Sequence, residues 1–146
     1  DLLAIEDLQI SIQEDPNSKW ALFYLGECLL SKKRYSEAIR NFNQAIAKGL
    51  SDSRVYNAKG RAYYLSKNYQ QSLMNYEKAY DMDKYDMTNL SAQAMPLAYM
   101  GQYEKALQKI SESKKLIETG VSYFDFMEAR VHAIFNKTSE SEFVFK

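Results

Sequence analysis

The chain has 146 residues, of which 46% are hydrophobic, 26% are charged, 5 are Gly and 2 are Pro. This length suits one globular unit, and so little Gly and Pro favours long regular elements over many tight turns. Lys and Arg together number 19, as do Asp and Glu, so no nucleic-acid or membrane partner is expected on electrostatic grounds. No apolar run is long enough to span a bilayer, and the single cysteine favours a reducing, cytoplasmic location.

Residues 1–18 are predicted to contain a helix that belongs to an incomplete repeat. Its Ala4, Leu8 and Ser11 find counterparts 34 residues later, in the second helix of the next unit, and Pro16 follows them. We therefore interpret residues 1–18 as the second helix of a truncated repeat.

Residues 19–52 contain two helical patterns joined by a short polar turn. In each pattern, apolar and small residues recur three and four positions apart, on one helical face. They are Leu22, Leu25, Gly26 and Leu29 in the first pattern, and Ala38, Phe42 and Ala45 in the second. Because one such hairpin cannot bury its apolar face alone, the hairpins are expected to stack.

Residues 53–86 and 87–120 repeat this unit at the same 34-residue period, with large residues falling on large ones and small on small. The matched positions are Gly26, Gly60 and Ala94; Tyr35, Tyr69 and Tyr103; Ala38, Ser72 and Ala106; and Phe42, Tyr76 and Ile110. Three copies at one period predict a single all-α domain over residues 1–146, a solenoid of antiparallel helical hairpins.

Pro96 interrupts the first helical pattern of residues 87–120. It has no backbone N–H and crowds the carbonyl of Ala92, so a kink is predicted near residues 92–96. A sharper hypothesis is that this bend shapes a binding groove.

The first-helix pattern resumes in residues 121–137, with Phe124, Met127 and Val131. For residues 138–146 the sequence predicts an irregular tail or the start of another helix, because Ser139 and Glu142 have the spacing of a capping box.

A 34-residue helix–turn–helix unit of this kind resembles the tetratricopeptide repeat. The residues that carry the resemblance are Leu25, Gly26, Leu29, Tyr35, Ala38, Phe42 and Ala45, then Gly60, Tyr63, Tyr69, Tyr76 and Ala79, then the phrase from Gly101 to Ala106. The resemblance implies a right-handed superhelix whose first helices line a concave face that holds extended or helical peptides.

Three positions depart from the family pattern. Lys59 and Gln93 stand where the family usually has a large apolar residue, so these faces are expected to be partly exposed. Glu128 replaces a close-packing Gly or Ala, which suggests that the last helix is a polar-backed cap.

Groups suited to catalysis or metal binding are scarce. Cys28 and His132 are the sole Cys and His, about three repeats apart in a stack where each repeat contacts only its neighbours. Asp81 and Asp83 lack the Gly and terminal Glu of a calcium loop. We therefore expect no enzyme, catalytic residue, metal or cofactor.

Carrying the family geometry over predicts a partner-binding groove. Arg54, Asn57, Arg61 and Tyr64 fall on one helical stripe, which supports the assignment independently. The predicted groove residues are Trp20, Phe23, Glu27, Arg54, Asn57, Arg61, Tyr64, Met95 and Tyr99, and on the last helix Ser122, Asp125, Ala129 and His132. The alternative for Trp20 and Phe23 is packing against the preceding half repeat.

The arginines favour an acidic or mixed peptide partner. Family members that clamp the C-terminal tails of heat-shock chaperones carry Lys and Asn in the first repeat, Asn in the second, and Lys with Arg in the third. The matching residues here are Phe23 and Glu27, then Ala58, then Thr88 and Ala92. None of them fits, so a chaperone-tail clamp is disfavoured.

Three functions stay open at this point. The first is a protein–protein interaction scaffold that binds a peptide or helical segment in the concave groove. The second is a regulatory domain attached to a larger enzyme or signalling protein. The third is self-association through the stack ends, favoured by apolar residues such as Leu2, Leu3 and Ile5.

Overall fold

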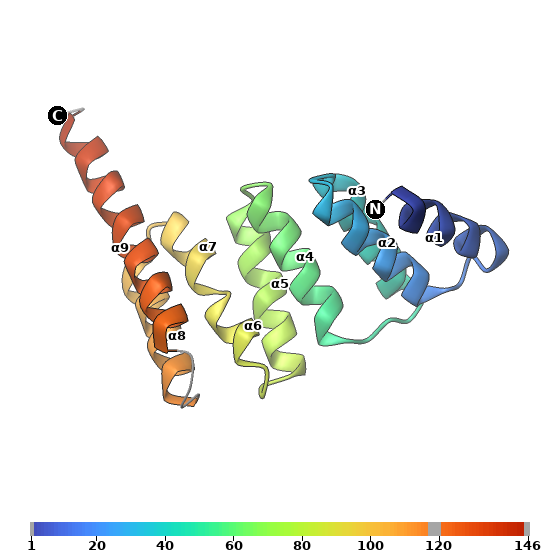
Figure 1. The fold of residues 1–146 in the computed structure, drawn as a ribbon. Helices are drawn as coiled ribbons and strands as arrows, with labels where there is room; N and C mark the ends of the chain where they lie inside the picture. Colours follow the sequence, from blue (N-terminus) through green and yellow to red (C-terminus); the bar gives the residue numbers. More distant parts are fainter. Residues whose placement is uncertain (1, 117–120, 145–146) are drawn as a thin grey trace.

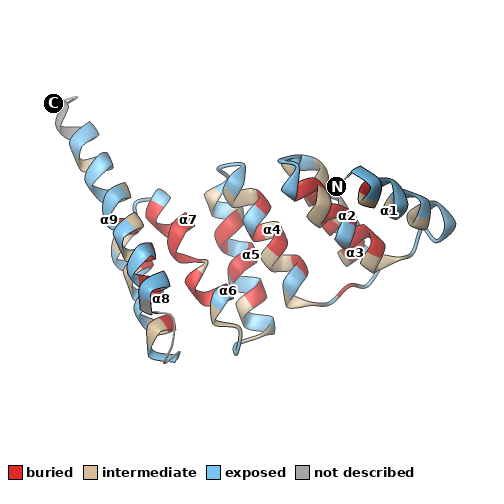
Figure 2. Cartoon of the chain, in the orientation of Figure 1, coloured by how far each residue is buried: buried red, intermediate tan, exposed pale blue. Residues whose placement is uncertain are grey.

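A computed structural model describes residues 2–116 and 121–144, and every regular element in these ranges is a helix (Figure 1). The helices are α1 (Leu2–Glu14), α2 (Lys19–Ser31), α3 (Tyr35–Ala47), α4 (Ser53–Leu65), α5 (Tyr69–Met82), α6 (Met87–Ser91), α7 (Ala94–Tyr99), α8 (Tyr103–Leu116) and α9 (Val121–Val144). They stack in a row in chain order, with buried residues on the faces between neighbours (Figure 2). The fold is an all-α solenoid, as predicted.

Each hairpin closes around a small residue on its first helix. A Cβ atom added to Gly26 of α2 would lie 2.5 Å from Cε1 of Phe42 in α3, and one added to Gly60 of α4 would lie 2.7 Å from Cδ1 of Tyr76 in α5. The aromatic ring therefore rests directly on the backbone of the facing helix. The small residues at this position in the sequence set the distance between the two helices of a hairpin.

The turn inside each hairpin uses one residue with positive φ. Lys33, Lys67 and Gly101 have φ of 61°, 64° and 79°, at the same 34-residue spacing. The next N–H in each case bonds back into the preceding helix, as Arg34 does to the carbonyl of Leu29 at 2.9 Å. This arrangement satisfies carbonyls at the helix end and reverses the chain.

The first helix of residues 87–120 is divided into α6 and α7, which confirms the predicted kink. Pro96 cannot donate to the carbonyl of Ala92, and the N–H of Gln93 bonds to Leu90 rather than continuing the ladder of α-helical bonds. The expected exposure of Gln93 is wrong, because this side chain is only 1% exposed. At the break, Nε2 of Gln93 donates a hydrogen bond to the carbonyl of Asn89 at 3.3 Å, and the side-chain amide of Gln93 lies inside the stack. Lys59 is half-buried, as expected, and burial lowers its pKa.

Helix α9 corrects the prediction for residues 138–144, because it runs without interruption to Val144, and residues 145 and 146 lie outside the described residues. The hydroxyls of Thr138 and Ser139 donate to the carbonyls of Ile134 and Phe135, four residues earlier, at 2.8 and 3.0 Å. A side chain engaged in this way lies within a helix and does not cap a new one. The spacing that resembled a capping box therefore falls in the interior of α9.

Candidate functional site

The middle of the stack holds a hollow of about 290 Å³ that is lined by residues of α2, α4 and α6 and by Asp86 just before α6. Its lining is Phe23, Glu27, Arg54, Asn57, Ala58, Arg61, Asp86 and Thr88. The structure thus brings together five of the residues that the repeat register predicted for the groove. They come from repeats that are 34 residues apart in sequence, so stacking alone assembles the hollow. We call this hollow the groove centre.

Both arginines of the groove centre already have carboxylate partners. Nη2 of Arg61 lies 2.9 Å from Oε1 of Glu27, its counterpart one repeat earlier. Arg54 makes a two-pronged contact with Asp52, through Nε at 2.9 Å and Nη2 at 2.8 Å. This contact holds the pKa of Asp52 below its ordinary value. With Asp86 also present, the groove centre carries both signs of charge and is not a basic patch.

A chain of side-chain amides forms the floor between α4 and α6. Nδ2 of Asn57 donates to Oδ1 of Asn89 at 2.6 Å, and Nδ2 of Asn89 donates to Asp86 at 3.2 Å. Asp86 also accepts from the backbone N–H of Thr88 as the N-cap of α6. Asn89 is fully buried, so its two bonds fix the orientation of Asn57 at the surface. Sequence reasoning missed Asp86, although an Asp directly before a helical pattern is an N-cap signal.

Trp20, which lies beside the groove centre, and Phe23, which lines it, differ in their surroundings. The guanidinium of Arg54 lies 4.9 Å from the centroid of the half-buried Trp20 ring. Phe23 is 6% exposed, and its ring packs 5.9 Å from that of Phe42 in the core. Trp20 is therefore only partly covered and packs beside Arg54, whereas Phe23 contributes mainly to the core.

Tyrosines of three helices gather beyond the groove centre. The rings of Tyr69 and Tyr99 stack at 4.7 Å, and Tyr64 lies about 6 Å from both. The hydroxyl of Tyr64 accepts a bond from Nη2 of Arg130 in α9 at 3.1 Å. Desolvation by burial is the main cause of the raised pKa of Tyr64. Tyr64 and Tyr99, both predicted for the groove, are thus joined in one aromatic cluster.

Met95 was predicted to line the groove, but it lies in the core and is 6% exposed. It belongs to one buried cluster with Phe124, Met127 and Val131 of α9. In α4 the residues in one core with the preceding hairpin are Val55, Ala58 and Ala62, whose counterparts in α9 are Tyr123, Phe126 and Arg130. In α9 the core stripe is shifted by one residue to Phe124, Met127 and Val131, and this packing covers Met95.

Because the core stripe of α9 is shifted by one residue, its surface stripe is shifted as well. Asp125, predicted for the groove, forms an ion pair with Lys114 of α8 at 2.8 Å, and His132 lies beside α8. The side chain that reaches the groove is Arg130, which contacts Tyr64 and lies 5.8 Å from the Phe126 ring. On α9, Arg130 therefore lies beside Tyr64, whereas Asp125 and His132 lie on the side of α8. Tyr123 and Phe126 are 54% and 60% exposed.

Within residues 2–116 and 121–144, no group of three or more His, Cys, Asp or Glu side chains is arranged to hold a metal ion. Over the same residues, no helix has the length and apolar character needed to cross a membrane.

Stacked antiparallel hairpins with a 34-residue period define the class of helical-repeat solenoids. Residues 3–62 match the family model described as tetratricopeptide repeat. Together with the solenoid fold, this match over residues 3–62 supports assignment to the tetratricopeptide-repeat family.

Solved structures with this fold cover most of the chain at low identity. YrrB, described as a tetratricopeptide-repeat protein with an unusual peptide-binding site, is 17% identical with a TM-score of 0.75, over 90% of this chain and 68% of YrrB. MamA from Desulfovibrio magneticus RS-1 is 20% identical with a TM-score of 0.73, over 77% of this chain and 63% of that one. A chain of the APC/C hetero-tetramer Cut9–Hcn1 is 20% identical with a TM-score of 0.81, over 89% of this chain and 26% of that one.

Among curated proteins, the Hsp70-Hsp90 organizing protein of Triticum aestivum is 24% identical over 117 residues. The match covers 80% of this chain and spans about a fifth of the length of that relative.

Proposed function

We propose that this chain is an interaction scaffold that holds a segment of a partner protein across the groove centre. The observation that carries the proposal is the assembly of Glu27, Arg54, Asn57 and Arg61 from successive first helices into one open hollow. Asn57 donates through Nδ2 to Asn89, so its side-chain carbonyl oxygen can accept a hydrogen bond from a ligand. Arg61 contacts Glu27 through Nη2, so its other guanidinium N–H groups are available as donors. An acceptor beside donors suits the C=O and N–H groups of a peptide backbone.

The charges of the groove centre favour a partner segment of mixed charge over a strongly acidic one. An acidic residue of the partner would compete with Glu27 for Arg61 and with Asp52 for Arg54. A segment that carries both signs can pair with the arginines and with the carboxylates they release. The residues at the chaperone-clamp positions, including the buried Phe23 and Ala58, give no support for a chaperone tail as the ligand.

Reversing the charge of both arginines should weaken binding. We expect Arg54→Glu/Arg61→Glu to raise the Kd of a peptide selected on the wild-type protein by about five- to thirty-fold, because each of the two exposed charge-assisted contacts is worth roughly 0.5–1 kcal/mol. The peptide would come from selection of a random 12-residue phage library on wild-type protein, with Kd measured by fluorescence anisotropy. Arg40→Glu/Lys78→Glu, which changes two exposed cations on the second helices, is the matched control. Equal loss in both variants, or none in either, would count against the groove centre.

Self-association is a second candidate, and it rests on α1. Leu2, Leu3 and Ile10 are all more than half exposed, although the corresponding positions of α3, α5 and α8 all carry polar residues. A cluster of exposed aliphatic side chains on one helix favours contact with another apolar surface. If α1 mediates such contact, sedimentation velocity at rising concentration should show dimers that Leu3→Glu/Ile10→Glu abolishes. A wild-type mass that stays monomeric at about 100 μM, well above a micromolar Kd, would exclude this role.

A further inference from the structure

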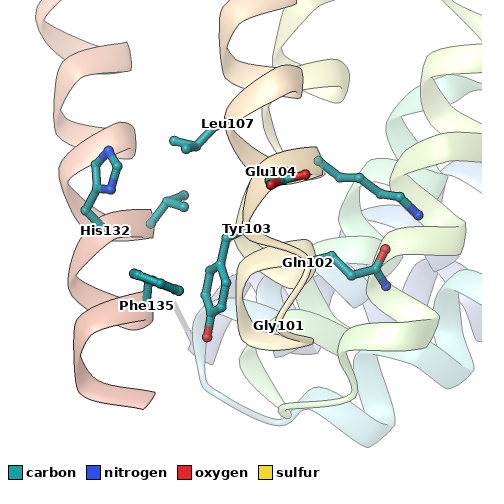
Figure 3. A pocket seen from close by; sticks show the side chains of 9 residues that line it. Gly101, Gln102, Tyr103, Glu104, Leu107, His132 and Phe135 are labelled. Carbon is teal, nitrogen blue, oxygen red and sulfur yellow. The ribbon is translucent and has the colours of Figure 1, made fainter. Parts of the chain in front are cut away.

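Helix α9 presents two different sides to the rest of the stack. On one side, His132 and Phe135 lie opposite α8 and line a cleft of about 760 Å³ (Figure 3). On the other side, Arg130 reaches the hydroxyl of Tyr64 in α4 at 3.1 Å, although α6 and α7 stand between the two helices in the row (Figure 1). Tyr64 follows Arg61 of the groove centre by three residues on the same helical face. Arg130 therefore continues the polar lining of the groove centre toward α9.

Arg130 differs from the other arginines in its charge environment. Every other arginine of the chain lies within ion-pair distance of a carboxylate of Glu27, Glu37 or Asp52. Among the described side chains, no carboxylate lies at that distance from Arg130. The acidic side chains that precede it on α9, Asp125 and Glu128, both pair with Lys114 of α8. The positive charge of Arg130 is thus left to an acidic group from outside the described chain.

The surroundings of Arg130 hold its guanidinium in place for such a group. Nη2 donates to the hydroxyl of Tyr64, and the ring of Phe126 lies 5.8 Å from the guanidinium carbon. A guanidinium has five N–H donors, so most of those of this partly exposed side chain stay available. Burial is the main cause of the raised pKa of Tyr64, so this hydroxyl keeps its proton at neutral pH and can donate as well. Neighbouring N–H and O–H donors suit the two oxygens of a carboxylate.

We propose that Arg130 and Tyr64 bind the side-chain carboxylate of an Asp or Glu in the partner segment that occupies the groove centre. The inference rests on the proposed function and gives the acidic residue of a mixed-charge segment a defined place. At the two arginines of the groove centre, an incoming carboxylate must displace an acidic side chain of this chain. At Arg130 it displaces none of the described ones. The ring of Phe126, which is 60% exposed, would contact the partner beside its acidic residue.

Parallel selections from the 12-residue phage library test the assignment, one on the wild-type chain and one on Arg130→Gln. A displayed peptide is fused to the coat protein at its C-terminus, so any carboxylate that is selected belongs to a side chain. On the wild-type chain we expect Asp or Glu to be enriched at one position of the aligned peptides. On Arg130→Gln this enrichment should be lost. Arg40→Gln makes the same change at an exposed arginine of α3 and should retain the enrichment.

A double-mutant cycle then measures the contact by fluorescence anisotropy. The probe is a peptide selected on the wild-type chain and synthesised with an amidated C-terminus. Replacing its enriched acidic residue with Asn or Gln should raise Kd about three- to ten-fold on the wild-type chain, and change Kd by less than about two-fold on Arg130→Gln. Tyr64→Phe keeps the ring and removes the hydroxyl, so it should weaken the acidic peptide about two-fold and leave the amide peptide unchanged.

The outcomes separate this inference from the proposed function. Peptides that Arg54→Glu/Arg61→Glu weakens, but whose acidic preference is absent or is unchanged in Arg130→Gln, would overturn the inference and leave the proposed function standing. Failure to select any peptide that the arginine reversal weakens would count against both. Arg130 is partly exposed, so Arg130→Gln should keep the thermal unfolding curve of the wild-type chain. If it does not, the peptide pair measured on Tyr64→Phe decides.

Discussion

Replacing Phe42 with Ala is expected to lower the free energy of unfolding by about 3–5 kcal/mol, because a fully buried ring is lost and a cavity remains. The ring fills the space above Gly26 and joins α2 to α3. Urea denaturation followed by circular dichroism measures the change. Met74→Ala on the exposed face of α5 is the control, with an expected change within about 0.5 kcal/mol.

The same contact predicts that Gly26→Ala destabilises the wild-type protein but stabilises a protein that already carries Phe42→Ala. In the wild-type protein the new methyl group would lie 2.5 Å from a carbon of the Phe42 ring. Over-packing costs about 1–3 kcal/mol, while Ala gains about 1 kcal/mol over Gly within a helix, so a net loss of up to about 2 kcal/mol is expected. In a Phe42→Ala background the clash is absent, and Gly26→Ala should gain about 1 kcal/mol. A stabilising effect in both backgrounds would show that the hairpin does not close on Gly26.

Gln93→Met is expected to raise the free energy of unfolding by about 1–2 kcal/mol, an unusual sign for a core substitution. Among the described residues, Oε1 of Gln93 has no hydrogen-bond partner although the side chain is 1% exposed. An unsatisfied buried carbonyl costs about 1–3 kcal/mol, and Met fills a similar volume without this cost. The substitution loses only the 3.3 Å bond to the carbonyl of Asn89.

Thermal and urea unfolding of Gln93→Met would be compared with Gln70→Met, which changes an exposed glutamine on α5 and should be neutral. Loss of stability in Gln93→Met alone would mean that the carbonyl of Asn89 depends on the Gln93 amide. In that case the buried amide would support the break between α6 and α7.

The fold could be predicted from the sequence because the residues that recur at the repeat period are those that pack the two helices of each hairpin together. Gly26 and Gly60 face Phe42 and Tyr76 at a fixed spacing, and those contacts set the hairpin geometry. The kink at Pro96 followed from the missing backbone donor. The uninterrupted course of α9 could not be predicted, because Ser139 and Glu142 have the spacing of a helix start. In the structure, the hydroxyl of Ser139 instead donates to a carbonyl within a continuing helix. A local motif cannot distinguish these two outcomes.

The candidate site was predictable where the repeat register holds and not where it fails. Arg54, Asn57 and Arg61 fall on one face of α4, and the structure gathers them in one hollow. The pairing of Arg61 with Glu27 depends on rotamers of exposed side chains, which spacing does not determine. Met95 was misplaced because α9 is rotated relative to the repeat, a consequence of packing its apolar stripe on α7 and α8.

Chemical-shift mapping with a selected peptide tests the groove most directly. Isotope-labelled protein would be titrated with a peptide from the phage library, and the side-chain signals of Asn57 and Arg61 would be followed together with the backbone amides. The proposed function predicts the largest shifts in these two side chains and in the amides of α2, α4 and α6. Shifts confined to α3, α5 and α8, with the Asn57 and Arg61 signals unchanged, would contradict it.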